Sequence, residues 1–191
     1  IGRSGIPRRE IFITSKVWNS DQGYLTTLDA FRESIERLDT DYIDLYLIHW
    51  PKGPLSLETW KAMEEIYESG RARAIGVSNF LVHHLEELLP HCKVTPMVDQ
   101  VEFHPYLQQP DLQSFCRANA IQFEAWSPIM KGQVNEIPLL QELAHRFGKT
   151  PVQVTLRWEI QKGIVTIPKS VHRDRILSNA EIFDFEIPAT D

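Results

Sequence analysis

Polar side chains that could do chemistry recur in this sequence directly after short apolar runs. Lys16 could serve as an amine nucleophile or as a charge that tunes a neighbouring acid. His49 could donate a hydrogen bond to a carbonyl oxygen or act as an acid or base. Ser and amide side chains could bind an amide-bearing ligand, and an indole could stack on a flat ring. The full set is Lys16, His49, Ser78 with Asn79, Gln100, Trp126 with Ser127, and Lys169 with Ser170.

Each of these residues also has a purely structural interpretation. His49 could be a core histidine at the end of a strand, and Lys16 a rim lysine that reaches water. Ser78 and Asn79 could cap backbone groups, and Trp126 could simply pack in the core. One such residue would mean little, but a polar group after every strand predicts a lined polar pocket.

The segment from Lys169 to Asn179 is the most specific local arrangement. Lys169 and Ser170 precede a predicted short helix that carries Arg173, Arg175 and Asn179. A helix N-terminus offers free N–H groups and a positive dipole end, so this combination predicts a phosphate site. The alternative is a solvated basic face at a helix end.

The elements that must position these residues follow from the apolar pattern. Leu45–Ile48 is a continuous apolar run before His49, typical of a strand buried on both faces, and Pro51 ends it. Other predicted strands are Ile11–Trp18, Ala72–Asn79, Pro96–Phe103, Ile121–Pro128 and Gly163–Ser170. Between them lie helical patterns, one with Leu28, Phe31, Ile35 and Leu38, and others that begin at Pro110 and, after Thr150 as N-cap, at Pro151. This alternation predicts parallel βαβ units with right-handed crossovers.

The fold class is therefore α/β, as a doubly wound sheet or a barrel. A doubly wound dinucleotide fold should carry a Gly-rich turn after a strand, and no G-x-G-x-x-G occurs. The choice is a (β/α)8 TIM barrel, represented by about six βα units in one domain over residues 1–191.

Composition excludes several functional classes. With 42% hydrophobic and 24% charged residues and a net charge of −6, we expect a soluble globular protein with no nucleic-acid partner. No apolar run approaches the ~18 residues of a membrane span, so no membrane partner is expected. Cys92 and Cys116 are expected to be reduced thiols of a cytoplasmic protein, and no metal-ligand spacing occurs.

Several segments resemble signature motifs of the aldo-keto reductases, NADP(H)-dependent (β/α)8-barrel oxidoreductases. They occur in the family's order and spacing over essentially the whole chain. The segments are Phe12–Trp18, Asp44–Pro51, Ala74–Phe80, Gln100–Pro105, Trp126–Pro128 and Ile167–Ser170, with Arg175 and Asn179 after them. In carrying Trp at position 126, the sequence resembles the branch of bacterial small-aldehyde and diketo-gluconate reductases.

The resemblance implies roles for individual residues. Lys16 and His49 match two members of a catalytic Asp-Tyr-Lys-His tetrad, and Trp18 and Trp50 match substrate-pocket positions. The Asp and Tyr belong to an earlier segment, so the first two βα units and the C-terminal specificity loop are expected to be absent from this chain. The implied NADP(H)-binding residues are Ser78, Asn79, Gln100, Trp126, Ser127, Lys169, Ser170, Val171, Arg175 and Asn179. Ser178 stands where many members carry Glu.

The function implied is NADPH-dependent reduction of small aldehydes and ketones by a monomeric enzyme. A tyrosine outside this chain would give the proton, assisted by Lys16, while His49 orients the carbonyl. Without that tyrosine, the chain alone is expected to be a poor catalyst. Two alternatives stay open: a non-catalytic NADP-binding or structural member of the fold, and a Schiff-base aldolase that uses Lys16.

Overall fold

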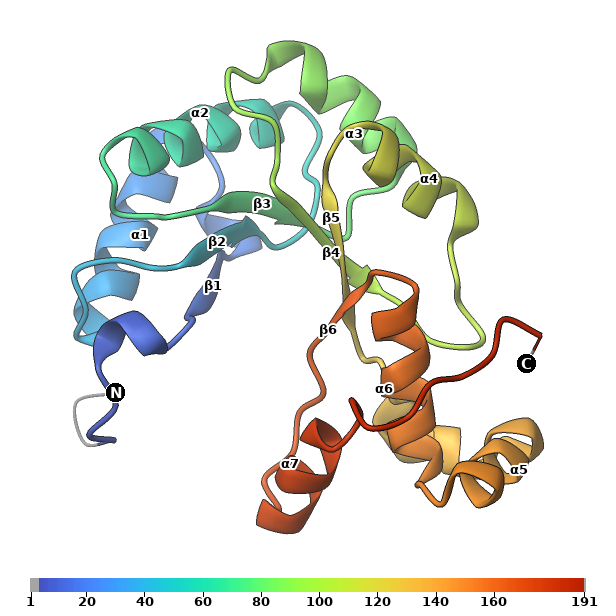
Figure 1. Cartoon of the computed structure of the whole chain (residues 1–191). Coiled ribbons are helices and arrows are strands. Elements are labelled where there is room, and N and C mark those ends of the chain that lie inside the picture. Colours follow the sequence, from blue (N-terminus) through green and yellow to red (C-terminus); the bar gives the residue numbers. More distant parts are fainter. Residues whose placement is uncertain (1–3, 191) are drawn as a thin grey trace. The chain divides into compact units, whose positions relative to one another are not determined.

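The computed structural model describes residues 4–190, and the chain forms two compact units (Figure 1). The first unit runs to Gln100 and includes Phe115–Ile121. The second comprises Val101–Ser114 and the residues from Gln122 onward. Strands alternate with helices along both units, which confirms the predicted α/β class.

The first unit is built on short parallel strands. They are β1 (Thr14–Val17), β2 (Leu45–Ile48), β3 (Ile75–Ser78) and β4 (Val98–Glu102), whose last two residues belong to the second unit. Neighbours in sequence are neighbours in the sheet, with Lys16 opposite Leu47, Ile48 opposite Val77, and Ser78 opposite Gln100. All residues of β2 and β3 are buried, as expected of central parallel strands. The ends of these strands therefore lie at one edge of the sheet.

Helices cover these strands because their apolar residues recur at helical spacing. In α1 (Tyr24–Leu38) the buried residues are Thr27, Phe31 and Ile35, and the Phe31 ring meets Tyr46 of β2 edge-on at 5.0 Å. Helix α2 (Pro54–Glu68) lies beside α1 (Figure 1). The remaining helical elements are α3 (Val82–Leu88), α4 (Pro110–Ala118), whose residues are shared between the two units, and the 3₁₀ turns η1 (Arg8–Glu10), η2 (Asn19–Asp21) and η3 (Leu89–His91).

The second unit pairs β5 (Gln122–Trp126) with β6 (Val165–Thr166) in parallel. Thr150 caps α6 (Pro151–Gln161) as predicted, because its hydroxyl accepts the Gln153 N–H at 3.2 Å. The other helical elements are η4 (Met130–Glu136), α5 (Pro138–Phe147) and α7 (Arg173–Ala180). One apolar cluster of this unit comprises Val134, Leu140, Leu143, Ala144, Val154 and Ile187.

Except for β2, which matches its predicted range, the strands are shorter than the segments that the sequence predicts. The largest difference is at β6, where Val165 and Thr166 alone pair, although Gly163–Ser170 was predicted. Pro168 has no N–H to offer a ladder, so the chain leaves the sheet before it. Within residues 4–190, none of the helices is both long and apolar enough to cross a bilayer.

Candidate active site

His49 directly follows β2, as predicted. Its backbone N–H donates to the Val17 carbonyl at 3.3 Å, which holds it against the end of β1. The imidazole lies 4.6 Å from the Trp18 ring and 6.4 Å from the Trp50 ring, centroid to centroid. Burial, and then the charge of Lys16, lower the pKa of His49 below its usual range. At neutral pH the side chain is therefore an uncharged imidazole among aromatic walls, able to donate a hydrogen bond without carrying charge.

Lys16 lies on β1, half-buried, in register with Leu47 of β2. It lines a cavity of about 340 Å³ together with Trp18 and, from α1, Glu33 and Arg37. His49 is not part of that lining, although the charge of Lys16 acts on its pKa. Lys16 is thus an electrostatic neighbour of His49, with Trp18 contacting both the cavity and the imidazole.

Ser78, Asn79 and Gln100 come together where the end of β3 lies beside the middle of β4. The Ser78 hydroxyl donates to the backbone carbonyl of Gln100 at 2.7 Å, and the backbone N–H of Asn79 donates to the same oxygen at 3.0 Å. The Asn79 side chain donates to the His49 carbonyl at 2.9 Å. The strand-end capping interpretation is thus realised in these contacts, and the same contacts fix these polar groups beside His49.

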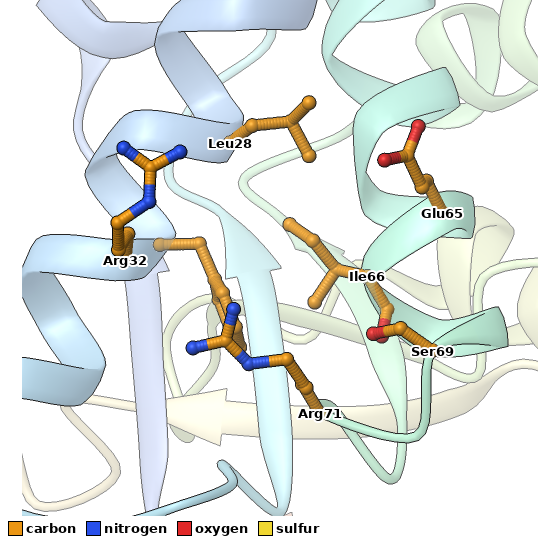
Figure 2. A pocket seen from close by; sticks show the side chains of 7 residues that line it. Leu28, Arg32, Glu65, Ile66, Ser69 and Arg71 are labelled. Carbon is orange, nitrogen blue, oxygen red and sulfur yellow. The ribbon is translucent and has the colours of Figure 1, made fainter.

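A smaller pocket of the first unit, about 210 Å³, lies between α1 and α2 (Figure 2). Leu28 and Arg32 of α1 line one side of it, and Glu65 and Ile66 of α2 line the other. Arg71, just after α2, closes one end. None of the predicted site residues belongs to this lining, so the pocket is separate from the strand ends that carry the candidate chemistry.

A further concave site lies wholly within the second unit. It is a cavity of about 800 Å³ whose lining includes Lys169, Ser170, Arg175 and Asn179 of the predicted phosphate site, whereas Arg173, also part of that prediction, lies outside the lining. Ser127 also lines it, whereas Val171 is 74% exposed and lies outside the lining. Trp126 ends β5, where its carbonyl accepts the Phe103 N–H at 3.3 Å. The donors of this cavity fit a phosphate-bearing ligand.

Sequence patterns did not reveal that η4 lines the same cavity. Lys131 adds a third cation to Lys169 and Arg175, and Asn135 adds an amide. Lys131 and Gly132 take positive φ angles of 55° and 99°, which break the helical path. The Lys-Gly pair shortly after Pro128 is a turn signal that could have marked this loop, but its polar residues follow no strand or helix period.

No cluster of three or more His, Cys, Asp or Glu side chains suited to a metal ion occurs in the part of the chain that the structure describes. Cys92 and Cys116 are free thiols, the former half-buried. Burial raises the pKa of each to about 12, so neither is poised as a thiolate nucleophile.

An α/β fold with a neutral histidine at a strand end and a cationic cavity after a later strand is typical of barrel oxidoreductases that use nucleotide cofactors. The model of the Aldo/keto reductase family matches residues 2–191. The chain belongs to this family, and its fold is the aldo-keto reductase (β/α)8 barrel. NADP(H) is the cofactor of the family.

Individual relatives are similar over the whole chain. Glyoxal reductase of Bacillus subtilis is 56% identical over 191 residues, which are 100% of this chain and 69% of that protein. The aldo-keto reductase MGS-M4, from a deep-sea metagenome library, is 47% identical with a TM-score of 0.97, over 99% of this chain and 71% of that one. A variant of Gox0644 in complex with NADPH is 43% identical with a TM-score of 0.92, over 96% of this chain and 68% of that one.

Proposed function

We propose that this protein reduces small aldehydes and ketones, reactive dicarbonyls among them, with NADPH. The observation that carries the proposal is the uncharged imidazole of His49, set between Trp18 and Trp50 and close to the charge of Lys16. The similarity to a glyoxal reductase supports small dicarbonyls as the substrate class.

The cavity of the second unit suits the phosphate-bearing half of the cofactor. Lys169 and Arg175 would meet the 2′-phosphate, with Ser170 and Asn179 as further hydrogen-bonding groups. Lys131, from η4, is a further cation for a phosphate in the same cavity. Ser78, Asn79 and Gln100 would hold the carboxamide end, and Trp126, with Ser127 after it, would stack on the flat ring.

When bound, the cofactor supplies the hydride. His49 would donate a hydrogen bond to the carbonyl oxygen and so orient the carbonyl carbon. Trp18 and Trp50, both substantially exposed, would form the apolar walls of the substrate pocket. The proton would come from the catalytic tyrosine of the family, whose pKa Lys16 would lower by its positive charge.

Activity tests this proposal directly. The complete gene product should oxidise NADPH in the presence of glyoxal-type dicarbonyls and small aldehydes. The His49→Gln variant should lose about 100-fold in kcat, whereas the same change at His145, exposed on α5, should leave it unchanged. No NADPH oxidation with any member of such a panel would refute the proposal. Borohydride trapping with substrate should leave Lys16 unmodified, and labelling of Lys16 would indicate an aldolase instead.

Cofactor preference tests the cavity separately. Lys169→Ala and Arg175→Ala should each weaken NADPH binding about 10-fold or more, because each removes a charged partner of the 2′-phosphate. NADH binding should change little. Arg173→Ala is the matched control, because Arg173 belongs to α7 but does not line the cavity. Equal weakening of both cofactors would contradict the phosphate assignment.

The proposal also includes a monomer in a reducing compartment such as the cytoplasm. The free thiols of Cys92 and Cys116 agree with that compartment. Sedimentation at micromolar concentration and cell fractionation would test the two points, and a stable dimer or an exported protein would contradict them.

A further inference from the structure

The turn between β3 and α3 contains Asn79 and directly follows Ser78, two of the residues proposed to hold the carboxamide end of the cofactor. Asn79 takes a left-handed conformation with φ of +63°. It donates hydrogen bonds to the backbone carbonyls of His49, after β2, and of Gln100, on β4. Phe80, the next residue, is 1% exposed. Leu81 then precedes the first residue of α3, where backbone N–H groups lack helical partners. What fixes Leu81 therefore fixes the far end of this turn.

His84 supplies that fixation with its side chain. Its Nδ1 accepts the backbone N–H of Leu81 at 3.0 Å, which requires Nδ1 to carry no proton. Its ring also contacts Phe80 edge-on at 5.8 Å and lies 3.8 Å from the ring of His83. One imidazole thus touches two of the three residues that join Ser78 to α3.

The surroundings of His84 favour its uncharged form. Burial lowers its pKa most, the charge of His83 lowers it further, and Glu87 acts in the opposite direction. A cavity of about 430 Å³ adjoins the ring, and Glu86, Glu87 and His91 are the other ionisable groups in its lining. The opposite wall consists of Pro51, Gly53, Pro54, Ser56 and Leu57, none of which ionises.

We propose that His84 is a positioning residue for the Ser78–Asn79–Phe80 turn. The neutral imidazole of His84 holds this turn through Leu81, and protonation of the imidazole releases the turn. The consequence rests on the proposed function: NADP(H) binds more weakly at mildly acidic pH because the carboxamide end of its site loosens. Protonation removes the acceptor from Leu81 N–H and places a cation beside His83. Asn79 passes the effect to His49, because its side chain is bonded to the His49 carbonyl.

Two variants of His84 test the proposal, with His145→Gln, at an exposed site on α5, as the control. In His84→Gln the side-chain oxygen can accept the Leu81 N–H, as in a capping box, but cannot titrate. In His84→Ala the acceptor is lost at every pH. Calorimetric titration with NADP⁺ at pH 5.5 and 7.5 compares the affinities of the variants. The 2′-phosphate of the cofactor titrates in every variant, so its effect cancels when the change in affinity of His84→Gln is subtracted from that of the wild type.

We expect the wild type and His145→Gln to lose about fivefold more affinity on acidification than His84→Gln does, the size of one hydrogen bond. At pH 7.5, His84→Gln should bind as the wild type does and His84→Ala about fivefold more weakly. Identical pH profiles for the wild type and His84→Gln, or unchanged affinity in His84→Ala, would overturn the proposal.

Stability gives a readout that needs no cofactor. The pKa of His84 is lowered in the folded state, so its contribution to stability is complete above the usual value of 6.5 and falls as pH drops below it. The unfolding midpoint in urea should therefore fall less on acidification in His84→Gln than in His145→Gln. If no NADP⁺ binds at any pH, the proposed function fails. If NADP⁺ binds and the midpoint shift occurs with no effect on affinity, the proposed function stands and the role of His84 fails.

Discussion

The side-chain amide of Asn79 donates a hydrogen bond to the backbone carbonyl of His49, with 2.9 Å between Nδ2 and O. This bond ties the end of β3 to the end of β2, at the residue proposed to orient the substrate. The left-handed φ of +63° at Asn79 is what turns its side chain back toward β2. One hydrogen bond therefore links Asn79, a proposed cofactor-binding residue, directly to His49, a proposed catalytic residue.

Replacing Asn79 by Asp should break this hydrogen bond with little change in the shape of the side chain. Asp tolerates the left-handed conformation, but its carboxylate would face the His49 carbonyl oxygen, with repulsion in place of a bond. We expect a loss of about 2 kcal/mol in the free energy of unfolding in urea. Asn79→Gly keeps the backbone conformation and removes the repulsion, so it should lose less. A free energy of unfolding equal to that of the wild type in both variants would contradict the importance of this bond.

Gly76, in the middle of β3, should tolerate no side chain. An added Cβ would lie 2.4 Å from the carbonyl oxygen of Val98 on β4 and 2.8 Å from a methyl carbon of Leu47 on β2. Both neighbours belong to the sheet, so relief requires the strands to shift. We expect Gly76→Ala to cost about 3 kcal/mol or more in thermal or urea unfolding. Gly70→Ala has open space at a φ of +76° and should cost only about 1 kcal/mol.

Asp44, before β2, should be among the most costly charges to remove. Its side chain is 5% exposed and accepts the Ile13 N–H at 2.9 Å and the guanidinium of Arg8 at 2.8 Å, while Arg73 lies at 3.3 Å. Asp44→Ala leaves these donors without their acceptor, so we expect a loss of about 3–5 kcal/mol in unfolding free energy. Asp29→Ala removes an exposed ion pair with Arg32 and should cost under ~0.5 kcal/mol.

Glu159, on α6, should make stability depend on pH. The side chain is 0% exposed, and burial raises its pKa to about 8, with the Thr166 hydroxyl acting in the opposite direction. The folded state holds this proton more tightly than the unfolded chain does. The contribution of Glu159 to stability is therefore complete below pH 4.5, the usual pKa of the side chain, and falls as pH rises toward 8. Glu159→Gln should therefore gain about 4 kcal/mol over the wild type at pH 8 and little at pH 4.5. Glu142→Gln, at an exposed site on α5, should show no such gain.

Much of this arrangement could be predicted from local patterns. The apolar run before His49 and the Thr150-Pro151 pair gave a buried strand and a capped helix, because burial and capping act between near neighbours. The bond between His84 and Leu81 left no such signal, since histidine is rarely expected to cap a helix. Pro168 is a local signal for the end of β6 before it, whereas the reduction of this strand to Val165 and Thr166 depends on which backbone groups find partners across the sheet.

The contact between Trp18 and His49 gives the proposed catalytic group an optical signature. An indole that lies 4.6 Å from an imidazole loses emission when the imidazole becomes a cation. Trp18 is 59% exposed, so its emission should lie toward the red and be separable from that of the fully buried Trp60. The difference in fluorescence between the wild type and Trp18→Phe, followed against pH, should trace the charge of His49 in solution without substrate or cofactor.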